Sequence, residues 1–108
     1  DIFVGGWFSD YNDPLDFLNV MKTGVYDSYG LYSNSEYDSL IDSLTGENDN
    51  AKRLEIYQKL EDLLVAQDCG VAPLYYSDKH YYYQNWVKDF YTSSFGASQE
   101  LYRASVQK

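Results

Sequence analysis

Two amphipathic patterns between residues 35 and 67 constrain the fold of this chain more than any other feature. The first repeats apolar side chains at the spacing of one helical face, at Tyr37, Leu40, Ile41 and Leu44. The second starts at Asp49 or Asn50, runs to about Gln67, and has the apolar face Leu54, Ile56, Tyr57, Leu60, Leu63 and Leu64. Gly46 separates the two patterns. The sequence therefore predicts two structural helices that each bury one face.

A shorter helix is predicted over residues 14–22. Asp13 can accept hydrogen bonds from first-turn amides, and Pro14 suits a first helical position, where its missing amide costs nothing. Its apolar face would comprise Leu15, Phe17, Leu18 and Met21. Gly24 is a plausible stop for this helix. Ser35-Glu36-Tyr37-Asp38 resembles a capping box with Asp in the place of Glu, so we expect Ser35 to cap the second helix.

Short strands are predicted outside the helices. Residues 1–8 are mostly apolar, and two further runs, 71–76 and 80–83, flank a turn at 77–79 and could pair as a hairpin. Residues 84–108 carry apolar anchors but no regular period. The predicted fold class is α+β (mixed α/β), with three helices plus short strands and a hairpin.

The charge of the chain excludes some partners. The 108 residues carry a formal net charge of -9 and no cluster of Lys or Arg, so we expect no nucleic-acid or anionic-membrane surface. No run approaches the roughly 20 apolar residues of a membrane span. The 13 tyrosines suit either a binding surface or a set of half-buried positions. A cationic or zwitterionic ligand is compatible with this composition.

Metal and catalytic motifs find little support. One cysteine (Cys69) and one histidine (His80) disfavour a zinc site and leave a Cys-His nucleophilic pair only on paper. An EF-hand loop starting at Asp10 fails, because Pro14 and Met21 occupy ligand positions, although a looser metal site is an alternative. The sequence also lacks a phosphate-binding Gly-rich loop and a Gly-x-Ser-x-Gly motif. We therefore expect no cofactor, no metal and no enzymatic activity.

The segment from Trp7 to Asp13 is the candidate binding site. It joins the predicted first strand to the first helix, and such loops can aim side chains from rigid supports. Asp10 lies beside aromatic residues and has no basic residue nearer in sequence than Lys22, so it is a candidate partner for a cationic ligand. The alternative is a solvated aspartate that shapes a turn. For Trp7 the alternative is a core residue.

These residues resemble a known family. Trp7-Phe8-Ser9-Asp10-Tyr11-Asn12-Asp13-Pro14 is similar to the Trp-x-x-Asp-Tyr-Asn-Asp/Glu-Pro segment of the oligopeptide-binding proteins of ABC importers, which belong to solute-binding family 5, the peptide and nickel class. The resemblance continues in order along the chain. It includes the helix segments Tyr37-Asp38-Ser39-Leu40-Ile41 and Arg53 to Glu61, then Val71-Ala72-Pro73-Leu74-Tyr75-Tyr76 and Trp86-Val87.

The resemblance implies an extracytoplasmic receptor, periplasmic or anchored as a lipoprotein, that binds oligopeptides and delivers them to ABC permease subunits. It implies that Asp10 pairs with the peptide α-amino group and that Trp7, Phe8 and Ser9 bond to its backbone. Residues 1–86 would end the C-terminal lobe of a class II periplasmic-binding-protein fold, and 87–108 would cross to a missing N-terminal portion. A fragment of this kind is expected to self-associate through apolar surface.

Two rival functions stay open. The acidic and aromatic residues also suit a carbohydrate-binding or glycoside-hydrolysing domain. The tyrosines suit a surface interaction module without a small ligand.

Overall fold

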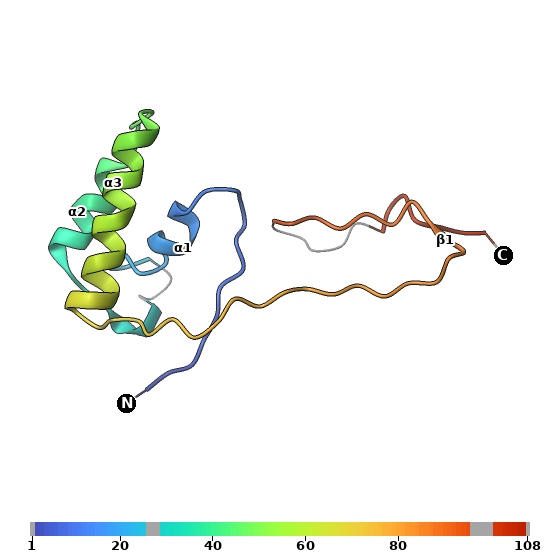
Figure 1. Cartoon of the computed structure of the whole chain (residues 1–108), viewed down its shortest axis with the longest axis horizontal. Coiled ribbons are helices and arrows are strands. Elements are labelled where there is room, and N and C mark those ends of the chain that lie inside the picture. Colours follow the sequence, from blue (N-terminus) through green and yellow to red (C-terminus); the bar gives the residue numbers. More distant parts are fainter. Residues whose placement is uncertain (1, 26–28, 96–100, 108) are drawn as a thin grey trace. The chain divides into compact units, whose positions relative to one another are not determined.

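The computed structural model describes residues 2–25, 29–95 and 101–107 of the chain (Figure 1). Contacts divide the chain into two units. The first comprises Asp1–Trp7 and Asp13–Pro73, and the second comprises Phe8–Asn12 and Leu74–Lys108. The first unit holds the helices α1 (Leu15–Asn19), α2 (Ser35–Ser43) and α3 (Asn50–Glu61). The second holds the short strands β1 (Val87–Lys88) and β2 (Ser105–Val106).

Helix α1 begins where the sequence predicts. The Asp13 carboxylate accepts the Leu15 amide at 2.9 Å, which satisfies a first-turn donor, and Pro14 has a helical φ of -55°. The regular helix is shorter than the predicted 14–22 and continues as turns, in which the Met21 amide bonds to the Leu18 carbonyl at 3.1 Å. Gly24 then adopts a φ of +78°, a conformation open to glycine without a side-chain penalty.

The cap of α2 corrects the sequence prediction. Asn34, not Ser35, is the N-cap: its side-chain oxygen accepts the amides of Glu36 at 2.8 Å and Tyr37 at 3.1 Å. Asn34 has an extended backbone, as an N-cap requires, whereas Ser35 is already helical. Both residue types favour caps, and the backbone geometry selects between them.

Helix α3 covers the predicted range together with its continuation. Asp49 caps it by accepting the amides of Ala51 and Lys52. Beyond Glu61 the helix continues as a π-helical segment, η2 (Asp62–Gln67). The chain leaves it with the Gly70 amide bonded to the Leu64 carbonyl at 2.8 Å.

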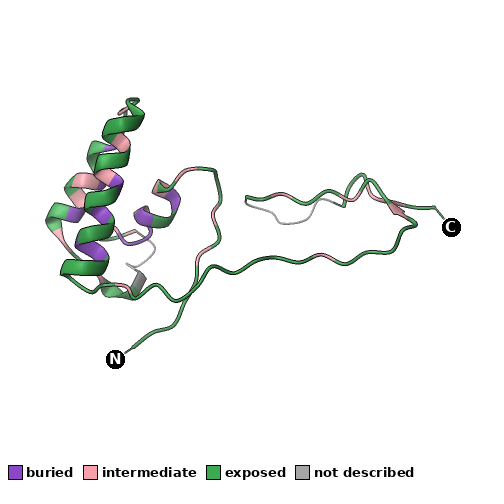
Figure 2. Cartoon of the chain, viewed as in Figure 1, coloured by how far each residue is buried: buried purple, intermediate pink, exposed green. Residues whose placement is uncertain are grey.

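The helices of the first unit pack around one core, because each of them contacts the other two. The buried residues lie on the helices and in the turns that follow α1 and α2 (Figure 2). The core comprises Leu18, Val20, Met21, Tyr37, Ile41, Leu44, Tyr57, Leu60, Leu63 and Leu64. Two predicted core residues are exposed, Phe17 at 49% and Leu54 at 57%. In the first turn of α3, the inward position is taken by the neighbouring Arg53, whose side chain is 18% exposed, and Leu54 faces outward.

The predicted strands 1–8, 71–76 and 80–83 are wrong for the described residues, which are irregular there. An apolar run shows that a segment can join a sheet, but a strand also needs a neighbouring strand to bond with. In the described part of the chain, the strands found are β1 and β2, which pair antiparallel with Val87 opposite Val106. These strands lie in the tail that showed no period.

Aromatic contacts organise the second unit. The Phe90 ring lies 5.0 Å from that of Tyr83 and 6.2 Å from that of Tyr81, measured between centroids. The Lys79 ammonium sits 4.3 Å from the centre of the Phe8 ring, a cation–π distance. No helix in the described residues is long and apolar enough to cross a membrane.

Candidate functional site

Trp7 is the first residue of the candidate segment, and a hydrogen bond holds its indole. Its ring packs partly against the helical core, and Nε1–H donates to the Asp16 carboxylate at 3.1 Å. Asp16 is 6% exposed and stands in the first turn of α1. A carboxylate is favourable there because the amides of a helix start carry partial positive charge. Trp7 therefore packs against the core without being buried in it, and its role toward a ligand stays a prediction.

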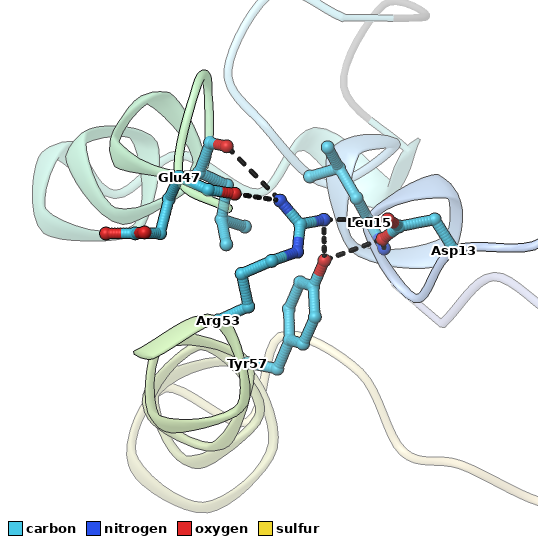
Figure 3. Close-up of polar contacts among 6 residues, drawn as sticks. Asp13, Leu15, Glu47, Arg53 and Tyr57 are labelled. Carbon is cyan, nitrogen blue, oxygen red and sulfur yellow. Dashed lines mark hydrogen bonds and ion pairs between the residues drawn. The ribbon is translucent and has the colours of Figure 1, made fainter. Parts of the chain in front are cut away.

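Asp13 is the last residue of the candidate segment, and its carboxylate accepts hydrogen bonds from α3 and from the start of α1 (Figure 3). Arg53 donates from Nη2 to Oδ2 at 2.7 Å, and the Tyr57 hydroxyl donates to Oδ1 at 2.6 Å. The Leu15 amide also donates to Oδ1. Arg53 and Tyr57 are one turn apart on α3, so both face the start of α1. We call Asp13, Arg53 and Tyr57 the aspartate clamp.

Arg53 extends the aspartate clamp to a third segment. Its Nη1 donates to the carbonyls of Leu44 at 3.3 Å and Glu47 at 3.1 Å, just beyond the end of α2 (Figure 3). Its Nη2 also donates to the Tyr57 hydroxyl at 2.5 Å. A planar guanidinium can serve these acceptors together, whereas a lysine ammonium is a single point charge. Arg53 thus ties the end of α2 and the start of α1 to α3.

The clamp shifts the pKa of Asp13 and that of Tyr57 in opposite directions. Burial alone would raise the pKa of Asp13, but the hydrogen bonds from Tyr57 and Leu15 and the charge of Arg53 outweigh it and lower the pKa. Burial and the bond to the Asp13 carboxylate raise the pKa of Tyr57 to about 12. At neutral pH the Asp13 carboxyl is therefore ionised and the Tyr57 phenol is neutral.

The remaining predicted site residues belong to the second unit. Phe8 is exposed, with Lys79 over its ring, and Ser9 is half-buried. Asp10 is exposed, as a residue that meets a ligand requires. Trp7 belongs to the first unit, so the structure assigns the four predicted residues to two units.

Other chemistry has little support in the described residues. There, no group of three or more His, Cys, Asp or Glu side chains could hold a metal ion. Cys69 and His80 are both exposed. A surface depression beside the clamp is lined by Asp13, Pro14, Asn50, Arg53, Leu54 and Tyr57.

Sequence reasoning found Asp13 as a helix start but missed its partners on α3. One signal was present: Arg53 and Tyr57 stand four residues apart on an otherwise apolar inward face. A cation and a hydroxyl on such a face require an acceptor. The pattern did not say which of the many acidic residues supplies it.

Comparison with known proteins identifies relatives of this chain. The chain is 32% identical to the periplasmic oligopeptide-binding protein of Salmonella typhimurium over 87 residues, covering 81% of the chain and 16% of that protein. It is 34% identical to the oligopeptide-binding protein of Bacillus subtilis over 86 residues, covering 78% of the chain and 14% of that protein.

A third relative is named for a different ligand. The probable deoxycholate-binding periplasmic protein of Escherichia coli is 34% identical over 70 residues, covering 65% of the chain and 13% of that protein. The chain thus spans about a sixth or less of the length of these three relatives. No family model and no solved structure matches the chain.

Proposed function

Because the chain is homologous to a segment of the oligopeptide-binding proteins of ABC importers, we propose that it is part of an extracytoplasmic receptor that binds oligopeptides for uptake. The observation that carries the proposal is the set of relatives named for peptides, each matching most of this chain. These relatives are binding proteins, which confirms the expectation of a non-enzyme and disfavours glycoside hydrolysis. Several are named periplasmic, in agreement with the expected location outside the cytoplasm.

The proposed ligand contact is a salt bridge between the Asp10 carboxylate and the peptide α-amino group. An ammonium–carboxylate hydrogen bond is charge-assisted and stronger than a neutral one. The exposure of Asp10 and the net charge of -9 both favour a cationic group at this point. Trp7, Phe8 and Ser9 would supply main-chain bonds, which give affinity without reading the peptide sequence.

The proposed place of the chain in the receptor is the end of the C-terminal lobe for residues 1–86. Residues 87–108 would cross to the N-terminal lobe, and the complete receptor would present its ligand to membrane permease subunits. The apolar surface of the second unit supports this placement, since Tyr76 and Tyr82 are almost fully exposed.

The test is a calorimetric titration of the complete receptor with one pentapeptide and its N-acetylated copy. We expect the free peptide to bind at least about tenfold more tightly, because acetylation removes the charge that Asp10 reads. Asp10→Asn should abolish that preference. Asp78→Asn, which removes the same charge from another exposed position, should preserve it.

Two outcomes would contradict different parts of the proposal. Equal affinity of the wild type for the free and acetylated peptides would refute the ammonium contact at Asp10. Failure to bind any member of a peptide mixture would refute peptide binding. Deoxycholate is the second probe, because one relative is named for it.

A further inference from the structure

The five residues Phe8–Asn12 leave the helical unit at Trp7 and return to it at Asp13. Both flanking side chains are fixed by hydrogen bonds within that unit. Trp7 donates to the buried carboxylate of Asp16 at 3.1 Å. Asp13 accepts from Arg53 at 2.7 Å and from Tyr57 at 2.6 Å. The segment that carries Asp10 is therefore joined at each end to a residue whose side chain is bonded within the helical unit.

The anchor at Asp13 restrains both the side chain and the backbone. Three donors bond to its carboxylate, so its rotamer is set by Arg53, Tyr57 and the Leu15 amide together. Pro14 follows directly, with its φ held by its ring at -55°. Asp10 lies three residues before this anchor in the sequence.

Tyr57 and Arg53, which donate to Asp13, are themselves held by further contacts. The Tyr57 ring is 9% exposed within the core, and the Arg53 guanidinium lies 5.5 Å from its centre. Arg53 is also bonded to the carbonyls of Leu44 and Glu47. A binding group needs such supporting contacts to stay within a fraction of an ångström of its working geometry.

We propose that Arg53 and Tyr57 are positioning residues for the peptide α-amino group, acting through Asp13 on the placement of Asp10. This inference rests on the proposed function. The clamp does not touch the ligand. It sets where the Asp10 carboxylate stands, and thereby how strongly the receptor prefers a free amino terminus over a blocked one.

The test measures that preference in the complete receptor carrying Tyr57→Phe. This change deletes the hydroxyl that donates to Asp13 and keeps the buried ring. The readout is the Kd for the N-acetylated pentapeptide divided by the Kd for the free one. A loss of folded protein weakens both peptides equally and leaves this ratio unchanged. We expect the ratio to fall by about three- to tenfold, the effect of one misaligned charge-assisted bond.

Tyr32→Phe is the matched control. It also deletes a hydroxyl that donates to a carboxylate in the helical unit, that of Asp68, at 2.8 Å. Asp68 lies far in sequence from Phe8–Asn12, so the ratio should stay at its wild-type value. Arg53→Lys is the second variant; it keeps the charge, loses the forked donors, and should also lower the ratio.

The outcomes separate the two ideas. An unchanged ratio in both Tyr57→Phe and Arg53→Lys overturns the positioning role and leaves peptide binding intact. An equal fall in Tyr32→Phe also overturns it, because the effect would then be a general one of the helical unit. A wild type that lacks the preference, or binds no peptide, refutes the proposed function itself and the inference with it.

Discussion

The helical unit and the second unit differ in what holds them together. The helices close one apolar core, with Tyr37 and Leu60 fully buried, and satisfy their ends with named side chains such as Asn34 and Asp49. In the second unit Leu74, Tyr76 and Tyr82 are largely exposed, and the strand pair found among its described residues has two residues in each strand. The first unit therefore has an apolar core of its own, whereas the described residues of the second unit are mostly exposed.

The predicted binding residues are divided between the two units. The predicted binding residues Phe8, Ser9 and Asp10 fall in the less buried unit, while their flanks Trp7 and Asp13 are fixed in the helical one. Binding groups carried on exposed segments and anchored by rigid elements are a common arrangement in proteins.

The largest expected effect comes from the helical core. Leu60→Ala should lower the free energy of unfolding by about 2–5 kcal/mol, because a fully buried leucine leaves a cavity. Leu74→Ala, at a residue 74% exposed, should change it by less than about 0.5 kcal/mol. Urea unfolding followed by circular dichroism measures both. Similar losses in the two variants would break the contrast between the units.

The aspartate clamp gives a smaller effect that depends on pH. Asp13→Asn should cost about 1.5–3 kcal/mol at pH 7, since it weakens hydrogen bonds to a charged group. The pKa of Asp13 is lowered in the folded state, so its contribution is present above the ordinary value of 3.8 and is lost as the pH falls through the folded pKa.

Unfolding of the wild type and of Asp13→Asn at pH 7 and at acidic pH checks this contribution. The difference between them should shrink below pH 3.8. Asp78→Asn is the control for loss of a charge. A difference that stays constant down to the lowest pH at which the protein folds would show that the Asp13 charge is not held by the clamp.

The smallest effect distinguishes the two candidate caps of α2. Asn34→Ala should destabilise the protein by about 1 kcal/mol, because it removes the acceptor of the Glu36 and Tyr37 amides. Ser35→Ala should stay within about 0.5 kcal/mol. Thermal unfolding of the two variants is sufficient. The reverse order would restore the capping box that the sequence suggests.

Local patterns predicted the helical unit well. Leu18, Ile41 and Leu60 were placed in the core by spacing alone, because helical periodicity needs no knowledge of distant residues. The partners of Asp13 lie 40 and 44 residues away and required the packing of α3 against the start of α1. The β1–β2 pair likewise joins residues almost 20 positions apart, within a tail that has no period.

The family that the sequence indicates is confirmed by the relatives. The roles of Asp10, Phe8 and Ser9 stay predictions, since they concern a ligand.

A double-mutant cycle between Asp13 and Tyr57 measures whether the two side chains of the aspartate clamp stabilise each other. Unfolding free energies of Asp13→Ala, Tyr57→Phe and the double variant yield the coupling between the two side chains. We predict a coupling of about 1 kcal/mol or more, because the 2.6 Å bond between them is charge-assisted. Additive effects, with a coupling near zero, would contradict the clamp and the positioning role built on it.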